Sequence, residues 1–279
     1  MSTFILPFDH RNGLAREIMG TSYPFSPADR ERACDLKRVI YDAFLLVHAE
    51  RTPHDHFAVL IDEETGSAIL HDAHERGIAT ILTLEQSGGE PFRLQYGEQS
   101  CERMQSLHAS LGKVLIHFSC IPKRDDAQLV TLQKLHAQCT HAGQSLLIEL
   151  LSSGSEDTRE HFLTHTIGLA TSMGIIPAFW KVEGLPSASA WNAVRTVAHA
   201  SSDILVLGRG EDQSHAEKMV RIAAQSRHDE KPTVNGFAIG RTIFADPLRS
   251  LLAGKLDREG AVHRIADNFR FFVAAWKRA

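Results

Sequence analysis

Lys181 is the residue with the clearest chemical potential, because it follows an apolar, strand-like run and stands directly after the aromatic pair Phe179-Trp180. Burial disfavours an ammonium ion, and a lysine amine in an apolar setting is a nucleophile that forms a Schiff base with a ketone. The alternative is a lysine that has left the strand and extends its charged end to solvent. The position of Lys181 therefore indicates amine chemistry, for which the rest of the chain must supply partners.

Two other charged residues stand in apolar runs. Glu149 lies within residues 146–151, where an unpaired carboxylate would be costly to bury. Lys113 begins the run at residues 113–118. We expect Glu149 to face Lys181 or Lys113 inside the fold, and a purely structural ion pair is the alternative.

The elements that must position these side chains form a regular alternation. Apolar runs are found at residues 4–8, 57–61, 79–84, 113–118, 145–150, 175–180, 203–207 and 234–239. Helical periodicity is found between them and after them, at residues 29–47, 126–140, 158–172, 188–200, 214–225 and 260–276. Such alternation predicts a parallel sheet with crossover helices, and eight repeats predict an α/β fold of the (β/α)8 TIM-barrel type. We expect one domain over residues 1–279, with 260–276 as the eighth helix. A doubly wound open sheet is the alternative, but Asp9-His10-Arg11-Asn12-Gly13 is not its glycine-rich turn.

Glycines and arginines follow the last two predicted strands. Gly208, Arg209 and Gly210 follow the seventh, while Gly240 and Arg241 follow the eighth. Barrels frequently bind phosphate on these two loops, where backbone N–H groups and a helix N-terminus face the anion. Arginine adds charge and paired donors. The segments therefore predict a phosphate site, and tight turns without a ligand are the alternative.

Composition excludes several classes of protein. A formal net charge of -4 and the absence of a dense Lys/Arg run argue against a nucleic-acid partner. No apolar run approaches the roughly 18 residues that a membrane span needs, and the start of the chain lacks the basic region of a signal peptide. The 4 cysteines form no C-x-x-C pair, which fits a reducing cytoplasm. Homo-oligomerisation is common for barrels, although no stripe of residues is diagnostic of it.

The 16 histidines raise the possibility of a metal site. Glu160-His161 with His165 comes closest, but the glutamate precedes the first histidine instead of following it as in H-E-x-x-H. We therefore expect no metal.

Five segments together resemble a known family. They are Phe8-Asp9-His10-Arg11, Lys113-Val114-Leu115, Leu147-Ile148-Glu149, Phe179-Trp180-Lys181-Val182-Glu183 and Gly236-Phe237-Ala238-Ile239-Gly240-Arg241-Thr242-Ile243-Phe244. The pattern, which spans nearly the whole chain, resembles the 2-deoxy-5-keto-gluconate 6-phosphate aldolase domain of bacterial myo-inositol catabolism. That family is similar to the class I tagatose 1,6-bisphosphate aldolases. The aromatic-Trp-Lys-x-Glu and Gly-Phe-Ala-x-Gly-Arg segments are the specific ones.

The resemblance implies a class I aldolase, a carbon–carbon lyase that needs no metal or organic cofactor. Lys181 matches the Schiff-base lysine, and Asp9, Lys113 and Glu149 match polar residues of the tagatose-type site. Gly240 and Arg241 match the phosphate-binding residues. The chain departs from the family in the loops at residues 119–124 and 208–212, and Gly184 replaces a proline. These departures bear on the substrate and leave the reaction class unchanged.

The implied substrate is a phosphorylated keto sugar acid. Lys181 would add to the C5 ketone of 2-deoxy-5-keto-gluconate 6-phosphate, and Glu149 would remove the C3 hydroxyl proton as the C3–C4 bond breaks. The products would be malonic semialdehyde and dihydroxyacetone phosphate. A second interpretation is a class I aldolase or transaldolase that acts on a ketose bisphosphate or a sulfonated sugar phosphate. A third, from another class of protein, is a non-catalytic sugar-phosphate sensor.

Overall fold

The computed structural model describes residues 2–89, 91–118, 122–152 and 156–279, and residues 122–126 and 156–157 by their backbone alone. The side chains of the segment at 119–124, where the chain departs from the resembled family, therefore all lie outside the described residues.

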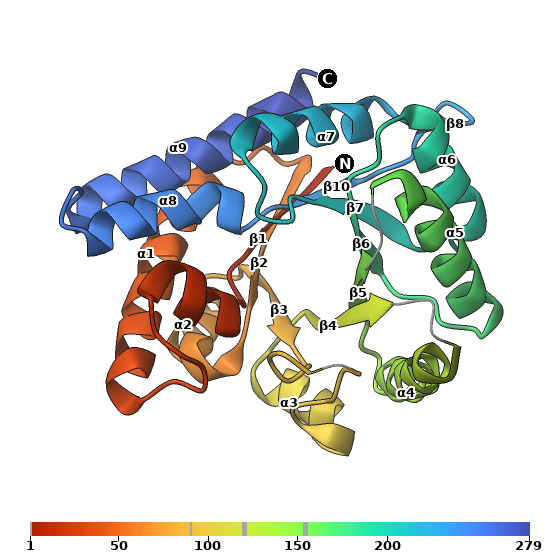
Figure 1. Ribbon diagram of the computed structural model, residues 1–279, viewed down its shortest axis with the longest axis horizontal. Coiled ribbons are helices and arrows are strands. Elements are labelled where there is room, and N and C mark those ends of the chain that lie inside the picture. The colour runs from red at the N-terminus through yellow and green to blue at the C-terminus, as the bar shows by residue number, and fades with distance from the viewer. Residues whose placement is uncertain (1, 90, 119–121, 153–155) are drawn as a thin grey trace.

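Parallel strands close into a barrel in the order β1-β10-β7-β6-β5-β4-β3-β2, shown in Figure 1. The strands are β1 (Ser2–Pro7), β2 (Asp55–Ile61), β3 (Ala79–Thr83), β4 (Leu111–Phe118), β5 (Leu146–Ser152), β6 (Phe179–Glu183), β7 (Asp203–Leu207) and β10 (Gly236–Ala238). The predicted (β/α)8 TIM-barrel fold is thereby confirmed. Two short strands, β8 (Arg227–His228) and β9 (Lys231–Pro232), form a separate antiparallel pair before β10.

The sixth strand begins later than its apolar run predicts. Residues 175–178 precede the ladder, and β6 pairs with β5 from Phe179 onward. The reason is Pro177, which has no N–H to donate to a neighbouring strand. Lys181 and Glu183 consequently lie within β6, whereas the predicted run ends at Trp180.

Helices surround the barrel (Figure 1). They are α1 (Pro27–Ala49), α2 (Glu63–Glu75), α3 (Ser100–Ser106), α4 (Pro122–His141), α5 (Glu156–Ser172), α6 (Ala188–Val197), α7 (Gln213–Gln225), α8 (Arg241–Leu252) and α9 (Arg258–Lys277), with the short π-helix η1 (Leu14–Met19) and the 3-10 helix η2 (Gly97–Gln99). Side-chain oxygens of Ser26, Asp62 and Asp257 cap α1, α2 and α9. The predicted last helix is α9, but α8 intervenes between it and β10. No helix among the described residues is long and apolar enough to cross a membrane.

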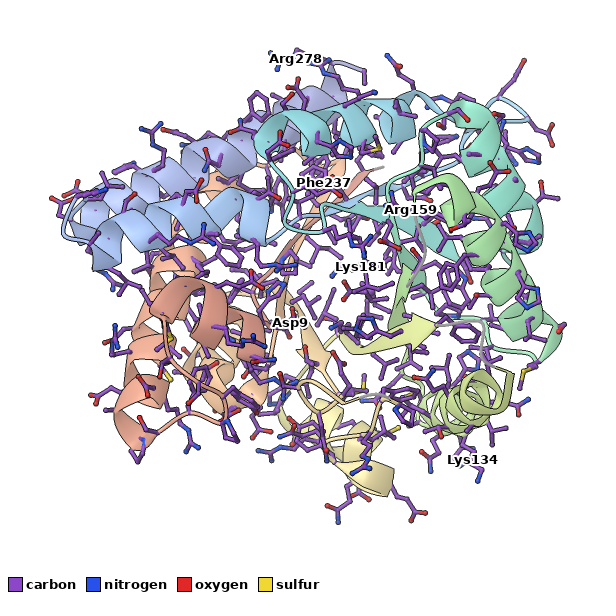
Figure 2. The ribbon with its side chains drawn as sticks, viewed as in Figure 1. Asp9, Lys134, Arg159, Lys181, Phe237 and Arg278 are labelled. Atoms are coloured by element: carbon purple, nitrogen blue, oxygen red, sulfur yellow. The ribbon has the colours of Figure 1, made fainter. Side chains whose placement is uncertain are left out.

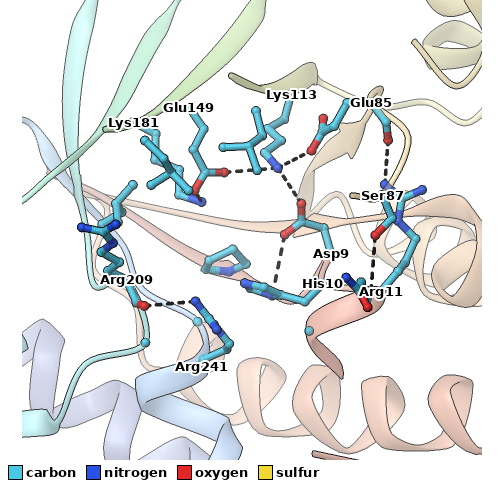
Figure 3. A pocket seen from close by; sticks show the side chains of 18 of the residues that line it. Asp9, His10, Arg11, Glu85, Ser87, Lys113, Glu149, Lys181, Arg209 and Arg241 are labelled. Atoms are coloured by element: carbon cyan, nitrogen blue, oxygen red, sulfur yellow. Dashed lines mark hydrogen bonds and ion pairs between the residues drawn. The ribbon is translucent and has the colours of Figure 1, made fainter. Parts of the chain in front are cut away.

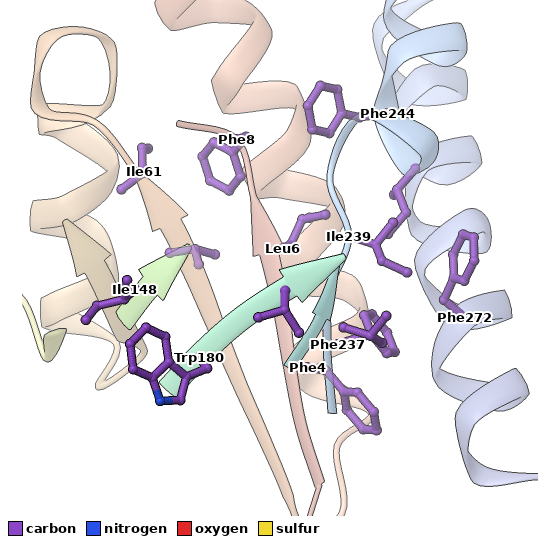
Figure 4. Close-up of a cluster of buried hydrophobic side chains, with 14 of the residues drawn as sticks. Phe4, Leu6, Phe8, Ile61, Ile148, Trp180, Phe237, Ile239, Phe244 and Phe272 are labelled. Atoms are coloured by element: carbon purple, nitrogen blue, oxygen red, sulfur yellow. The ribbon is translucent and has the colours of Figure 1, made fainter. Parts of the chain in front are cut away.

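Two apolar layers hold the barrel together. The outer layer packs the strands against the helices and includes Phe4, Trp180, Phe237 and Phe272 (Figure 4). The inner layer fills the barrel with Ile5, Ala58, Leu60, Ile81, Leu147, Leu205 and Ala238. Because the inside of the barrel is packed, we expect a ligand to bind at the end of the barrel where the carboxyl ends of the strands meet.

Candidate active site

A cavity of ≈ 550 Å³ opens at the carboxyl ends of the strands. Its lining includes every residue predicted for the site: Asp9, Lys113, Glu149, Lys181, Gly208, Arg209, Gly240 and Arg241. Figure 2 shows Asp9 and Lys181 near the centre of the molecule, while Lys134 and Arg278 lie at its periphery. The structure therefore gathers these residues from strands and loops far apart in the sequence.

Strand periodicity places the charged side chains one layer above the inner apolar layer. Side chains two residues apart share a face of a strand, so Glu149 follows Leu147 toward the open end of the barrel, and Lys181 follows Phe179. Leu147 pairs with Phe179, and Glu149 pairs with Lys181, in the parallel β5–β6 ladder. A layer of charged side chains therefore lies directly above the inner apolar layer, and the register of the sheet sets the spacing of Glu149 and Lys181.

Glu149 joins the two lysines. Its Oε1 lies 2.7 Å from Lys181 Nζ, and its Oε2 lies 3.2 Å from Lys113 Nζ. Figure 3 shows the side chain of Glu149 between those of the two lysines. Lys181 is 4% exposed, so its side chain does not extend to solvent. A carboxylate at this distance can take a proton from the ammonium and return it, which is the geometry required of a general acid–base partner.

Lys113 lies at the centre of the carboxyl groups. Its Nζ donates to Asp9 Oδ2 at 2.9 Å and to Glu85 Oε1 at 2.6 Å. Thr83 Oγ1 also donates to Asp9 Oδ2, at 2.8 Å. Glu85 was visible in the sequence only as a polar residue after a strand, a signal too common to single it out.

The charges of this cluster support one another. Burial alone would raise the pKa of Asp9 and of Glu149, but the nearby lysines hold both below their ordinary values. Burial would lower the pKa of Lys113, yet Asp9, Glu85 and Glu149 together raise it well above its ordinary value. Burial raises the pKa of Glu85, and the attraction of Lys113 does not fully offset it. Lys113 therefore keeps its positive charge. Among the three carboxyl groups around it, Glu85 is the one that protonates most readily.

His10 is a site residue that the sequence did not single out. It lines the cavity, and its Nδ1 lies 3.9 Å from Asp9 Oδ1. Desolvation, opposed by Asp9 and reinforced by Arg241 and Lys181, lowers the pKa of His10 to about 4. The imidazole is therefore neutral near neutral pH. The adjacent Arg11 turns to the loop after β3, where its Nη2 donates to the carbonyl oxygen of Glu85 at 2.6 Å.

The opposite side of the cavity carries Arg209 and Arg241 (Figure 3). The neighbouring glycines Gly208, Gly210 and Gly240 also line the cavity. Gly240 precedes α8 without a side-chain cap. The N–H of Ile243 donates to the carbonyl oxygen of Gly240 at 2.8 Å, which leaves the N–H groups of Arg241 and Thr242 without a partner within the helix. A Cβ at Gly240 would lie 2.3 Å from the carbonyl oxygen of Pro7, which explains the glycine. Arg209 and Gly210 both have positive φ, at 50° and 79°. Uncapped N–H groups beside two arginines form an arrangement suited to an anion.

Both arginines have carboxylate partners that the sequence did not reveal. Arg241 Nη1 donates to Glu17 at 2.8 and 2.7 Å, and Arg241 Nη2 donates to the carbonyl oxygen of Arg209 at 3.0 Å. Arg209 Nη1 lies 2.7 Å from Glu183. Glu17 stands in η1, more than 200 positions before its partner, so only the closed barrel brings the pair together. Within the part of the chain that the structure describes, no three His, Cys, Asp or Glu side chains could jointly hold a metal ion.

Comparison with known proteins places the chain by its family and fold. The model of a family described as "Uncharacterized protein conserved in bacteria (DUF2090)" matches residues 1–279. A crystal structure of Cgl0159 from Corynebacterium glutamicum is similar, with 14% identity and a TM-score of 0.61, over 97% of this chain and 86% of that chain. So is a fructose-bisphosphate aldolase from Slackia heliotrinireducens, with 10% identity and a TM-score of 0.59, over 96% of this chain and 85% of that chain. No curated protein matches. At these identities the solved structures share the barrel fold with this chain.

Proposed function

We propose that this chain, which belongs to the DUF2090 family, is a class I aldolase acting on a phosphorylated keto sugar acid, with 2-deoxy-5-keto-gluconate 6-phosphate as the best candidate. We assign the whole of residues 1–279 to this one catalytic domain. The observation that carries the proposal is the buried Lys181, whose Nζ lies 2.7 Å from Glu149 at the open end of the barrel. The resemblance of the five sequence segments supports the substrate.

The first half of the reaction forms an imine. Lys181 passes a proton to Glu149, and the neutral amine adds to the C5 ketone. The carbinolamine then loses its hydroxyl group as water, with Glu149 returning the proton. The product is an iminium ion, which draws electrons from the neighbouring carbon.

Cleavage follows from the same pair of residues. Glu149 takes the C3 hydroxyl proton, the C3–C4 electron pair moves into the iminium ion, and malonic semialdehyde leaves. The enamine on Lys181 is then protonated at C4 by Glu149, and water releases dihydroxyacetone phosphate and the free lysine. General acid–base help of this kind contributes about 10²–10⁴-fold to a rate.

The remaining residues hold the reactants in place. Lys113 keeps Asp9 and Glu149 oriented through contacts of 2.9 and 3.2 Å, and all three can bind substrate hydroxyl groups. The phosphate binds at the N-terminus of α8 and beside Arg209, with Gly208 and Gly240 allowing the backbone to approach it.

Borohydride trapping tests the proposal. The protein is treated with sodium borohydride in the presence of dihydroxyacetone phosphate, and the intact mass is measured for wild type, Lys181→Met and the peripheral control Lys134→Met. We expect an adduct on wild type and Lys134→Met, and none on Lys181→Met. An adduct that persists in Lys181→Met would refute the role of that lysine.

Turnover distinguishes the alternatives. Release of malonic semialdehyde from 2-deoxy-5-keto-gluconate 6-phosphate is expected. A trapped adduct without this release would redirect the assignment to a ketose bisphosphate or a sulfonated sugar phosphate. Binding of the sugar phosphate without any adduct would favour a sensor.

A further inference from the structure

Glu183 is a buried carboxylate on the same strand face as Lys181, two residues further along β6. It is 1% exposed and lies outside the residues that line the main cavity. The reaction proposed above does not use it. Burying a carboxylate is costly unless its oxygens are satisfied, so its contacts identify what it does.

Three elements meet at this carboxylate. Glu183 Oε2 accepts hydrogen bonds from the N–H and the Oγ of Ser152 at the end of β5, both at 2.7 Å. Arg159 of α5 brings its Nε to 3.8 Å from Glu183 Oε1 and anchors its Nη1 on the carbonyl oxygen of Gly184 at 2.7 Å. Arg209 of the loop after β7 brings its Nη1 to 2.7 Å from the same Oε1. The carboxylate thus ties the β7 loop to β5 and α5.

Arg209 is the partner that reaches the cavity. Its side chain is 40% exposed and lines the cavity, whereas the side chain of Arg159 is 7% exposed. Its backbone has a φ of 50°, a left-handed conformation that a residue with a side chain adopts at a cost. Since Arg241 donates to the carbonyl oxygen of Arg209, the placement of one arginine also affects the other.

A guanidinium group has several donors in a fixed plane, so one carboxylate contact sets the direction of the rest. We propose that Glu183 is a positioning residue that holds Arg209 at the phosphate end of the cavity, and so sets the preference for a phosphorylated over an unphosphorylated ketone. This inference rests on the proposed function. It adds that Lys181 and Glu183, on one strand, serve the two ends of one substrate: Lys181 bonds to the ketone carbon, and Glu183 acts on the phosphate through Arg209.

The test compares two ketones that differ only in the phosphate. Borohydride trapping is measured over a range of concentrations of dihydroxyacetone and of dihydroxyacetone phosphate. The readout is the half-saturating concentration of dihydroxyacetone divided by that of dihydroxyacetone phosphate, a ratio that is high when the protein prefers the phosphorylated ketone. In Glu183→Gln we expect this ratio to fall about tenfold, the effect of weakening one charge-assisted contact. The exposed control Glu259→Gln is expected to leave the ratio at its wild-type value. A carboxylate that only stabilised the fold would change both concentrations together and leave the ratio unchanged.

A double variant identifies Arg209 as the intermediary. Arg209→Met is expected to lower the ratio at least as far as Glu183→Gln does, and adding Glu183→Gln to it should lower the ratio no further. Independent, multiplying effects of the two substitutions would overturn the inference.

The remaining outcomes are also decisive. A wild-type protein that traps neither ketone overturns the proposed function and this inference with it. A wild-type protein that prefers the phosphorylated ketone, with an unchanged ratio in Glu183→Gln, overturns the inference alone. If Glu183→Gln does not fold, Ser152→Ala removes one hydrogen bond to the carboxylate, and we expect the ratio to fall about threefold. An unchanged ratio in Ser152→Ala would then count against the inference.

Discussion

Replacing Lys113 with methionine removes the cation that three buried carboxyl groups share. The Nζ of Lys113 lies 2.9 Å from Asp9, 2.6 Å from Glu85 and 3.2 Å from Glu149, and the lysine is 3% exposed. Methionine has nearly the same length, so the change leaves packing almost intact and deletes the charge. The effect on stability is therefore electrostatic.

Its size follows from the burial of the partners. Removing one member of a buried ion pair costs about 3–5 kcal/mol, because the remaining charge has no compensation. In the wild-type protein Asp9 and Glu149 have pKa values below their ordinary ones, so their contribution to stability is complete above about pH 4 and is lost only below it. Between about pH 8 and 5 these two groups leave wild-type stability nearly constant.

The stability of the variant, in contrast, changes with pH over this range. Glu149 keeps its ion pair with Lys181, whereas Glu85 and Asp9 lose their nearest cation. Burial then raises the pKa of Glu85 and of Asp9, so the folded variant takes up a proton at a pH where the unfolded chain does not. Each such proton returns about 1.4 kcal/mol of stability per pH unit as the pH falls. We expect Lys113→Met to be about 4 kcal/mol less stable than wild type near pH 8, and only about 1–2 kcal/mol less stable near pH 5.

Urea unfolding followed by tryptophan fluorescence measures this difference. Trp180 is fully buried beside Lys181 in β6 and reports on the barrel itself. The control Lys134→Met, at an exposed position of α4, should stay within about 0.5 kcal/mol of wild type at every pH. A Lys113→Met deficit that is the same near pH 8 and near pH 5, or smaller than about 1 kcal/mol near pH 8, would refute the reasoning.

Glu149→Gln should slow cleavage about 10²–10⁴-fold, because the amide cannot exchange the proton. Borohydride should still trap some ketone on Lys181, since the amine remains. Cleavage within tenfold of the wild-type rate would exclude Glu149 as the base. Lys37→Met should destabilise the protein by about 3–5 kcal/mol, since the buried Lys37 pairs with the buried Asp62 that caps α2. Urea unfolding beside Lys134→Met measures this loss, and equal stability of the two variants would show that the buried pair contributes nothing.

The barrel and the central lysine–glutamate pair could be predicted because they depend on local patterns. Apolar runs mark the strands, and a charged residue inside such a run stands out. Once the barrel order is known, Glu149 and Lys181 must be neighbours, because β5 and β6 are adjacent and parallel. The start of β6 was misplaced because apolar character outweighed the missing N–H of Pro177.

The partners of the arginines could not be predicted in the same way. Glu17 and Glu183 meet Arg241 and Arg209 only through closure of the barrel and the direction of long side chains. The helix α8, which begins at Arg241, was likewise absent from the expected helices, since its first residues read as a loop after a strand and Pro247 lies inside it. Side-chain direction and loop geometry are tertiary properties that spacing does not encode.

The two ends of the cavity differ in the kind of backbone that carries them. Lys181 and Glu149 stand on β6 and β5, and each of these strands is hydrogen-bonded on both sides. Arg209 stands on a loop whose placement depends on side-chain contacts. Loops open locally at low free-energy cost, whereas central strands exchange their amides only near global unfolding. If the proposed function holds, warming or mild denaturation should therefore abolish the proposed selectivity for the phosphate first, while the proposed amine chemistry persists until the barrel itself opens.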